Sequence, residues 1–101
     1  MELTLEDADS RQTVSVGEEI CVQLPETPTT GYLWRSEVDT ATLELLGDRY
    51  EVSERPRGAA GWHVFTFRAR KDGPTALTLV QGRPWETGHT SEYRVDLDVR
   101  A

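Results

Sequence analysis

The chain of 101 residues has a single cysteine, Cys21, so it cannot form an internal disulfide bond. A chain of this size without disulfides depends on a packed hydrophobic core for its stability. Asparagine is absent altogether, which removes any site for N-glycosylation. The length is typical of one folded unit, and we expect a single domain over residues 1–101.

Positive charge is also scarce. The chain has 11 Lys and Arg against 18 Asp and Glu, which gives a formal net charge of −7. Nucleic-acid binding requires a basic face that neutralises phosphates, and docking on anionic lipid requires the same. We therefore expect neither nucleic acid nor a membrane among the partners.

Long apolar runs are missing, most plainly at the start of the chain. Residues 1–10 contain four acidic side chains and no hydrophobic stretch. This composition matches neither a signal peptide nor a membrane anchor. Together with the lack of disulfides, it predicts a cytoplasmic protein.

Alternation of apolar and polar residues with a period of two runs through most of the chain. It is clearest near the end, where Tyr93, Val95, Leu97 and Val99 interleave with charged residues. The same pattern includes Val14, Val16, Ile20, Val22, Leu24, Phe65, Phe67, Ala69, Leu77 and Leu79. A period of two is typical of strands with one face in the core and one in solvent.

Turn-forming residues separate the alternating runs. They are Gly17, Pro25, Pro28, Gly31, Gly47, Asp48, Pro56, Gly58, Gly61, Asp72, Gly73, Pro74, Gly82, Pro84 and Gly88. The stretch 39–46 is too short for a stable helix and contains two threonines, so it predicts a turn and a brief strand. The pattern predicts an all-β, immunoglobulin-like β-sandwich of about seven to eight strands. With one cysteine it lacks the signature of antibody domains.

The first predicted loop, residues 25–31, is rich in proline and threonine. Pro28 restricts the backbone, Gly31 permits a positive φ angle, and Thr29 and Thr30 can bond to nearby backbone groups. A loop held in this way loses little entropy when it docks on a partner. The same residues also suit an ordinary turn between two strands.

The second predicted loop, residues 55–61, reads Arg-Pro-Arg-Gly-Ala-Ala-Gly. Its GxxG spacing does not open a helix and lacks the lysine of a phosphate-binding loop, so phosphate binding is disfavoured. A plain connection between strands is the simpler interpretation.

The third predicted loop, residues 81–89, places Trp85 among polar residues, where no core strand is expected. Tryptophan and arginine are enriched at binding hot spots. Trp85 could equally fold back as a cap on the core. In an immunoglobulin-type topology these three connections lie at the same end of the sandwich, so the loops are expected to converge.

The three loops resemble the three motifs of chagasin-like inhibitors of papain-family cysteine proteases. Residues 27–34 are similar to the family motif Asn-Pro-Thr-Thr-Gly-aromatic-x-Trp, with Thr27 in place of Asn. Residues 58–65 are similar to the GxxGxxxF motif, and residues 83–86 to the RPW motif. The loss of the Asn side chain at position 27 is expected to lower affinity.

The resemblance implies a reversible, non-covalent, tight-binding inhibitor that occludes the active-site cleft with three loops. Thr29 would lie nearest the catalytic residues of the target, and Trp85 would contact the primed side of the cleft. The residues expected to contact the protease are Thr27, Pro28, Thr29, Thr30, Gly31, Tyr32, Arg57, Gly58, Ala59, Ala60, Gly61, Arg83, Pro84 and Trp85. The partner would be a papain-like cysteine protease, and we expect the free chain to be a monomer.

An enzyme is the first alternative, because Cys21, His63 and His89 invite a nucleophile or a metal site. Cys21 falls inside a predicted strand, without a helix N-terminus or a glycine-rich turn to activate the thiol. Two distant histidines and one cysteine match no standard zinc spacing. We therefore predict no catalytic residues, no metal and no cofactor.

A generic immunoglobulin-like interaction module with a non-protease partner is the second alternative. It explains the predicted fold, and it would explain an exposed Trp85. It does not explain why the three motifs occur together in the family order. The position of Trp85, exposed or buried, is the first observation that bears on binding by these loops.

Overall fold

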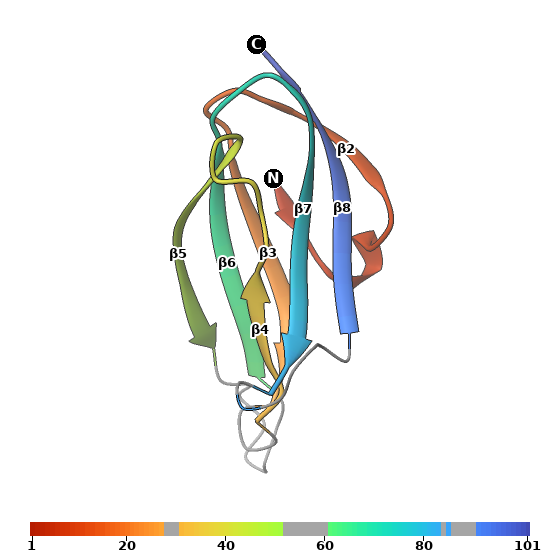
Figure 1. Cartoon of the computed structure of the whole chain (residues 1–101), viewed down its shortest axis with the longest axis vertical. Coiled ribbons are helices and arrows are strands. Elements are labelled where there is room, and N and C mark those ends of the chain that lie inside the picture. The colour runs from red at the N-terminus through yellow and green to blue at the C-terminus, as the bar shows by residue number, and fades with distance from the viewer. Residues whose placement is uncertain (28–30, 52–60, 84, 86–90) are drawn as a thin grey trace.

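The computed structural model describes residues 1–27, 31–51, 61–83, 85 and 91–101. The strands are β1 (Glu2–Leu3), β2 (Arg11–Ser15), β3 (Glu19–Glu26), β4 (Leu33–Ser36), β5 (Leu43–Glu51), β6 (Gly61–Ala69), β7 (Gly73–Gly82) and β8 (Ser91–Arg100). They form two four-stranded sheets, in the orders β1-β3-β6-β5 and β2-β8-β7-β4 (Figure 1). The predicted all-β sandwich is confirmed, and its strand number lies within the predicted range.

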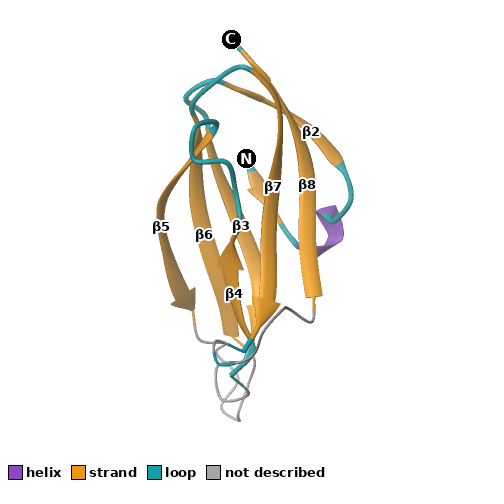
Figure 2. Ribbon diagram, in the orientation of Figure 1, coloured by secondary structure: helices purple, strands orange, loops and turns teal. Residues whose placement is uncertain are grey.

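The N-terminal segment contributes an edge strand to each sheet. β1 pairs with β3 in parallel, and β2 pairs with β8 in parallel, whereas the other pairings are antiparallel. A short 3-10 helix, η1 (Leu5–Asp7), lies between β1 and β2 (Figure 2). A membrane-spanning helix is not found in the described part of the chain. The first 15 residues of the chain therefore pair with one edge of each sheet.

The alternating residues form the core between the sheets. In β8, Tyr93, Val95, Leu97 and Val99 are all buried, and the residues between them are exposed or half-buried. The same core contains Val14, Ile20, Val22, Leu24, Trp34, Leu43, Phe65, Phe67, Ala69, Leu77 and Leu79. Burial of apolar surface of this kind contributes about 25 cal/mol per Å² to folding. Val16 differs from the prediction and is 43% exposed, because β2 ends at Ser15.

Two of the predicted strand breaks are wrong. Gly47 and Asp48 lie inside β5, where the register with β6 shifts between Leu45 and Gly47. This β-bulge accommodates the glycine, so the strand bends and continues. The predicted brief strand after residue 42 is thus nine residues long.

Pro25 also lies inside a strand, because β3 continues through Pro25 to Glu26 and pairs with Trp62 and Gly61. Proline is tolerated where a strand has a neighbour on one side only. The paired residues of β1 stop at Cys21 and Val22 of β3, so the N-terminal neighbour does not extend to Pro25. The first loop therefore begins later than predicted.

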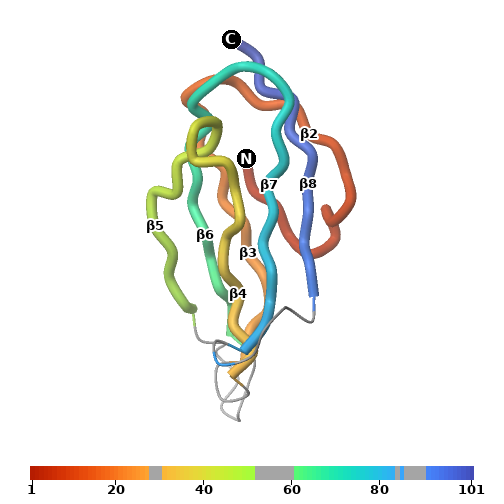
Figure 3. Tube along the Cα trace, in the orientation of Figure 1, coloured from red at the N-terminus to blue at the C-terminus, as the bar shows by residue number. Residues whose placement is uncertain are grey.

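The two ends of the sandwich differ in their connections. Short turns at one end join β2 to β3 and β6 to β7, and at the other end β3, β5 and β7 finish while β4, β6 and β8 begin (Figure 3). We call the first the turn end and the second the loop end. The three predicted loops are the connections β3–β4, β5–β6 and β7–β8, which all start and finish at the loop end, as expected for an immunoglobulin-type topology.

Candidate functional site

The predicted contact residues fall in three stretches, which we call the first segment (27–32), the second segment (57–61) and the third segment (83–85). The loop end brings together those of their residues that the structure describes. These residues are Thr27, Gly31, Tyr32, Gly61, Arg83 and Trp85. The other predicted contact residues, Pro28, Thr29, Thr30, Arg57, Gly58, Ala59, Ala60 and Pro84, lie outside the described residues. The geometry of the site is therefore built from the residues at the base of each segment and from Trp85.

Trp85 is exposed and rests on the first segment. Its side chain is 70% exposed. Gly31 has a φ angle of 79°, and a Cβ atom at this position would lie 2.6 Å from Cη2 of the Trp85 indole. Only glycine satisfies both the backbone angle and the close approach. Of the two alternatives left open for Trp85, an exposed side chain and a cap buried on the core, the structure shows the first.

Arg83 lies between two aromatic rings. Its guanidinium carbon is 4.3 Å from the ring centroid of Tyr32 and 5.8 Å from that of Trp85. Cation–π contacts of this kind contribute about 0.5–2 kcal/mol each. They connect the exit of the first segment to the third segment and restrict the side chains that surround the exposed indole.

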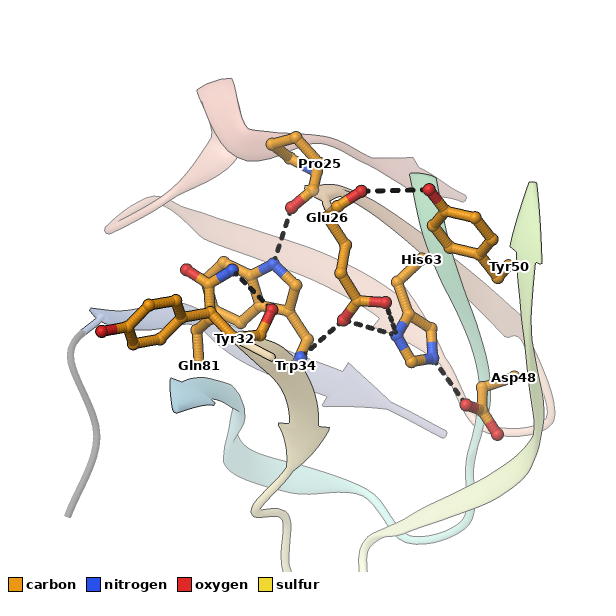
Figure 4. A network of polar contacts seen from close by, with 8 residues as sticks. All are labelled: Pro25, Glu26, Tyr32, Trp34, Asp48, Tyr50, His63 and Gln81. Atoms are coloured by element: carbon orange, nitrogen blue, oxygen red, sulfur yellow. Dashed lines mark hydrogen bonds and ion pairs between the residues drawn. The ribbon is translucent and has the colours of Figure 1, made fainter. Parts of the chain in front are cut away.

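Backbone pairing holds the same two segments side by side. β4 pairs with β7, with Leu33 opposite Gly82. The Gln81 side-chain amide also donates a hydrogen bond to the Tyr32 carbonyl oxygen, at 3.3 Å (Figure 4). The first and third segments therefore leave the sandwich from neighbouring strands of one sheet.

Glu26 closes the base of the first segment. Its carboxylate is buried, with 4% of the residue exposed, and it accepts a hydrogen bond from the Trp34 backbone N–H at 2.7 Å. The Trp34 indole N–H donates to the Pro25 carbonyl oxygen at 2.9 Å. These two bonds tie the end of β3 to the start of β4, and both sides of the first segment are thereby held together.

The second segment is joined to the first through β5 and β6. Gly61 is opposite Glu26, and the Tyr50 hydroxyl donates a hydrogen bond to the Glu26 carbonyl oxygen at 3.3 Å. A Cβ atom on Gly61 would overlap the Tyr50 hydroxyl and the Glu51 carbonyl oxygen. A glycine is needed here because the neighbouring strand approaches too closely for any side chain.

His63 lies between two carboxylates, as Figure 4 shows. Its Nδ1 atom is 3.0 and 3.1 Å from the two carboxylate oxygens of Glu26, and its Nε2 atom is 2.5 Å from Oδ2 of Asp48. The sequence pattern did not predict that His63 would lie between Glu26 and Asp48. One signal was present: Glu26 continues the inward alternation of Ile20, Val22 and Leu24, which indicates a buried carboxylate at the loop end.

The described residues do not combine Cys21 and His63 into a nucleophile and base. Cys21 lies on the outer face of β3 and is half-buried, between Ile20 and Val22, which point into the core. His63 is opposite Leu24, whose side chain points inward, and its ring stacks on Phe65. The cysteine and the histidine are therefore on opposite faces of the sheet.

This chain is similar to known proteins over most of its length, including all three segments. The family described as "Chagasin family peptidase inhibitor I42" matches residues 13–99. Amoebiasin-2 of Entamoeba histolytica is 32% identical over 89 residues, which cover 85% of this chain and 72% of that protein. Chagasin of Trypanosoma cruzi is 34% identical over 88 residues, which cover 79% of each chain.

A solved structure shows the same fold. The crystal structure of the cysteine protease inhibitor EhICP2 from Entamoeba histolytica has a TM-score of 0.90 to this chain, with 27% sequence identity. The superposition covers 98% of this chain and 94% of that one.

Proposed function

Since this chain belongs to the chagasin family of peptidase inhibitors, we propose that its loop end blocks the active-site cleft of papain-like cysteine proteases. The chain is an inhibitor and not an enzyme, as the family consists of protease inhibitors. The inhibition is reversible and non-covalent, because binding by three loops forms no bond with the catalytic cysteine.

The observation that carries this proposal is the exposed indole of Trp85, seated on Gly31 beside Arg83 and Tyr32. A large aromatic side chain that is exposed yet restricted can bury its area on a partner at a low cost in entropy. Arg83 adds a cation between two rings, and both residue types are typical of binding hot spots.

The roles of the individual loops follow from the family resemblance and the position of each segment. Thr29, with Thr30 and Gly31, forms the central wedge, and Trp85 with Arg83 and Pro84 contacts the primed side. Gly58 to Gly61 contact the opposite side of the cleft. An interface of standard size buries about 800 Å² on each partner, which three converging loops can provide.

Steady-state inhibition of papain and of a cathepsin L-type enzyme tests the proposal, with a fluorogenic peptide as substrate. We expect competitive inhibition in the nanomolar range, on the order of −12 kcal/mol of binding free energy. Activity should return when the preformed complex is diluted. No inhibition at micromolar concentrations of the folded chain would favour the alternative, an interaction module whose partner is not a protease.

The double substitution Thr29→Ala with Trp85→Ala tests the assigned roles. Loss of two hot-spot residues is expected to weaken inhibition by about 3–5 kcal/mol, or roughly 150- to 5,000-fold. A control at the turn end is Thr13→Ala with Val16→Ala, which removes an exposed threonine of β2 and truncates a 43% exposed valine just after β2. Equal inhibition constants for the two double variants would contradict the assignment.

A further inference from the structure

The carboxylate of Glu26 lies at a junction of three strands at the loop end. It accepts the backbone N–H of Trp34 in β4 and faces the imidazole of His63 in β6. Glu26 is the last residue of β3 and directly precedes the first segment, while His63 follows the second segment by two positions of β6. One buried carboxylate therefore contacts the strands that carry both segments.

The imidazole of His63 has a carboxylate at each ring nitrogen. Both Glu26 oxygens are within 3.1 Å of Nδ1, and Asp48 Oδ2 is 2.5 Å from Nε2. A neutral imidazole carries one N–H, so it donates to only one of the two carboxylates. The doubly protonated ring donates to both, and hydrogen bonds between ionised partners are stronger than neutral ones.

The groups that face the ring come from each neighbouring element. β3 contributes the Glu26 carboxylate, and β5 contributes the Asp48 carboxylate. The Tyr50 hydroxyl of β5 lies on the Glu26 carbonyl oxygen, and the ring of Phe65 stacks on the imidazole at 4.1 Å. Two carboxylates therefore face one imidazole, one at each ring nitrogen.

We propose that Glu26 and His63 are positioning residues for inhibition, and that the inhibitor binds its protease more tightly when His63 is doubly protonated. This inference rests on the proposed function of the loop end. The imidazolium neutralises the buried Glu26 carboxylate, which in turn holds the Trp34 N–H and closes the base of the first segment. When the ring is neutral, one carboxylate loses its N–H donor, and the bases of the first and second segments are held less firmly.

A looser base lowers affinity because the segments must then be ordered as they dock. The loss is partial, since the neutral ring still donates one hydrogen bond. From the net contribution of one hydrogen bond we expect inhibition to weaken about three- to ten-fold between pH 5.5 and pH 7.5, the range in which histidine changes charge.

The test compares inhibition constants at pH 5.5 and pH 7.5 for the wild-type chain and for His63→Gln, with papain as the target. For each chain we take the ratio of the inhibition constant at pH 7.5 to that at pH 5.5. Dividing the wild-type ratio by the ratio of the variant removes the pH dependence of the protease itself. We expect the wild-type ratio to exceed that of His63→Gln by about three- to ten-fold. His89→Gln, which removes the other histidine of the chain, should keep the wild-type ratio.

Glu26→Gln gives a readout that a purely structural role would not produce. The amide oxygen can still accept the Trp34 N–H, and the amide nitrogen can donate to a neutral His63 ring. We therefore expect a flat or reversed pH dependence for this variant. Asp48→Asn is a second variant that should fold, since the Asp48 side chain is 49% exposed, and its pH dependence should shrink.

Equal pH dependence in the wild-type chain, His63→Gln and Asp48→Asn would overturn this inference and leave the proposed function standing. Loss of the pH dependence in His89→Gln would also overturn it. Absence of inhibition by the folded wild-type chain at both pH values would overturn the proposed function and the inference together.

Discussion

The two ends of the sandwich use their polar groups in different ways. At the turn end, some polar groups bond within a single turn: Ser15 N–H donates to Glu18 Oε1, and Ala41 N–H donates to Asp39 Oδ1. At the loop end, the Glu26 carboxylate joins β4 and β6, and the Trp85 indole covers a glycine from another segment. Other bonds of the turn end join distant turns, such as the 2.7 Å contact between the Thr42 and Thr75 hydroxyls. The two ends therefore differ in the groups they use: the loop end is held by a buried carboxylate and leaves an aromatic side chain exposed for a partner.

The largest expected effect comes from Trp34, whose side chain belongs to the core and to the base of the first segment. Trp34→Ala should lower the free energy of unfolding by about 3–5 kcal/mol, because it leaves a cavity in the core. It also removes the indole bond to the Pro25 carbonyl oxygen. Urea denaturation measures the loss, and Trp62→Ala on the outer face of β6 is the matched control. Equal losses for the two would mean that Trp34 does not have the core role assigned to it.

Trp85 is the converse of Trp34, because it should matter for binding and not for folding. Trp85→Ala should change the free energy of unfolding by no more than about 1 kcal/mol, since the residue is 70% exposed and loses one exposed cation–π contact. Its inhibition constant should rise by about 30- to 1000-fold, the effect of losing one hot-spot residue. A variant that unfolds more easily but inhibits normally would reverse the comparison between the two tryptophans.

Tyr93 is a buried residue of the core between the two ends, and its contribution to stability should depend on pH. Burial, and then the nearby Asp7 carboxylate, raise the pKa of Tyr93 to about 12, and its hydroxyl donates to the Thr4 carbonyl oxygen at 2.9 Å. A folded-state pKa above the ordinary value of 10.0 means that the stabilisation is complete below pH 10 and is lost as the pH rises towards 12.

The expected decline of Tyr93's contribution is at most about 1.4 kcal/mol per pH unit over this range. Denaturant unfolding at pH 9, 10 and 11 measures the decline, and Tyr93→Phe should be less stable at pH 9 and show a shallower slope. A slope unchanged by Tyr93→Phe would assign the alkaline loss to other groups.

The smallest expected effects concern one glycine at each end. Gly17 and Gly31 have φ angles of 89° and 79°, so alanine at either position should cost about 1 kcal/mol of stability. Only a Cβ atom at Gly31 meets the Trp85 indole, whereas one at Gly17 meets no atom within 4 Å. Gly31→Ala should therefore weaken inhibition about ten-fold, and Gly17→Ala should not. Similar inhibition by both variants would show that the Gly31–Trp85 contact does not shape the binding surface.

Sequence patterns predicted the body of the fold better than its connections. The inward residues of β3, β6, β7 and β8 follow the period of two, because a strand that is half in the core requires that period. Gly47 and Pro25 were wrongly expected to end strands. Gly47 is accommodated by a β-bulge, and Pro25 lies where β3 has a neighbour on one side only. Both features depend on neighbouring strands, which a local sequence pattern does not describe.

The candidate site was predictable to the extent that its residues are contiguous. Three short motifs identified the segments, and their described members lie at one end of the sandwich: Thr27, Gly31, Tyr32, Gly61, Arg83 and Trp85. The pairing of Glu26 with His63 was not predicted, because the inward alternation that ends at Glu26 does not show which residue lies beside its carboxylate. Their roles arise from the register that sets β3 against β6 and from the neighbouring position of Asp48 in β5.

The sequence by itself determined the fold class, the faces of the main strands and the contents of the three segments at the loop end. These properties depend on residues a few positions apart, and local periodicity and short motifs record them. Only the tertiary structure decided that Trp85 lies on Gly31 and that His63 lies between Glu26 and Asp48. The physical reason is that such contacts depend on strand order and register, which bring together residues far apart in the chain.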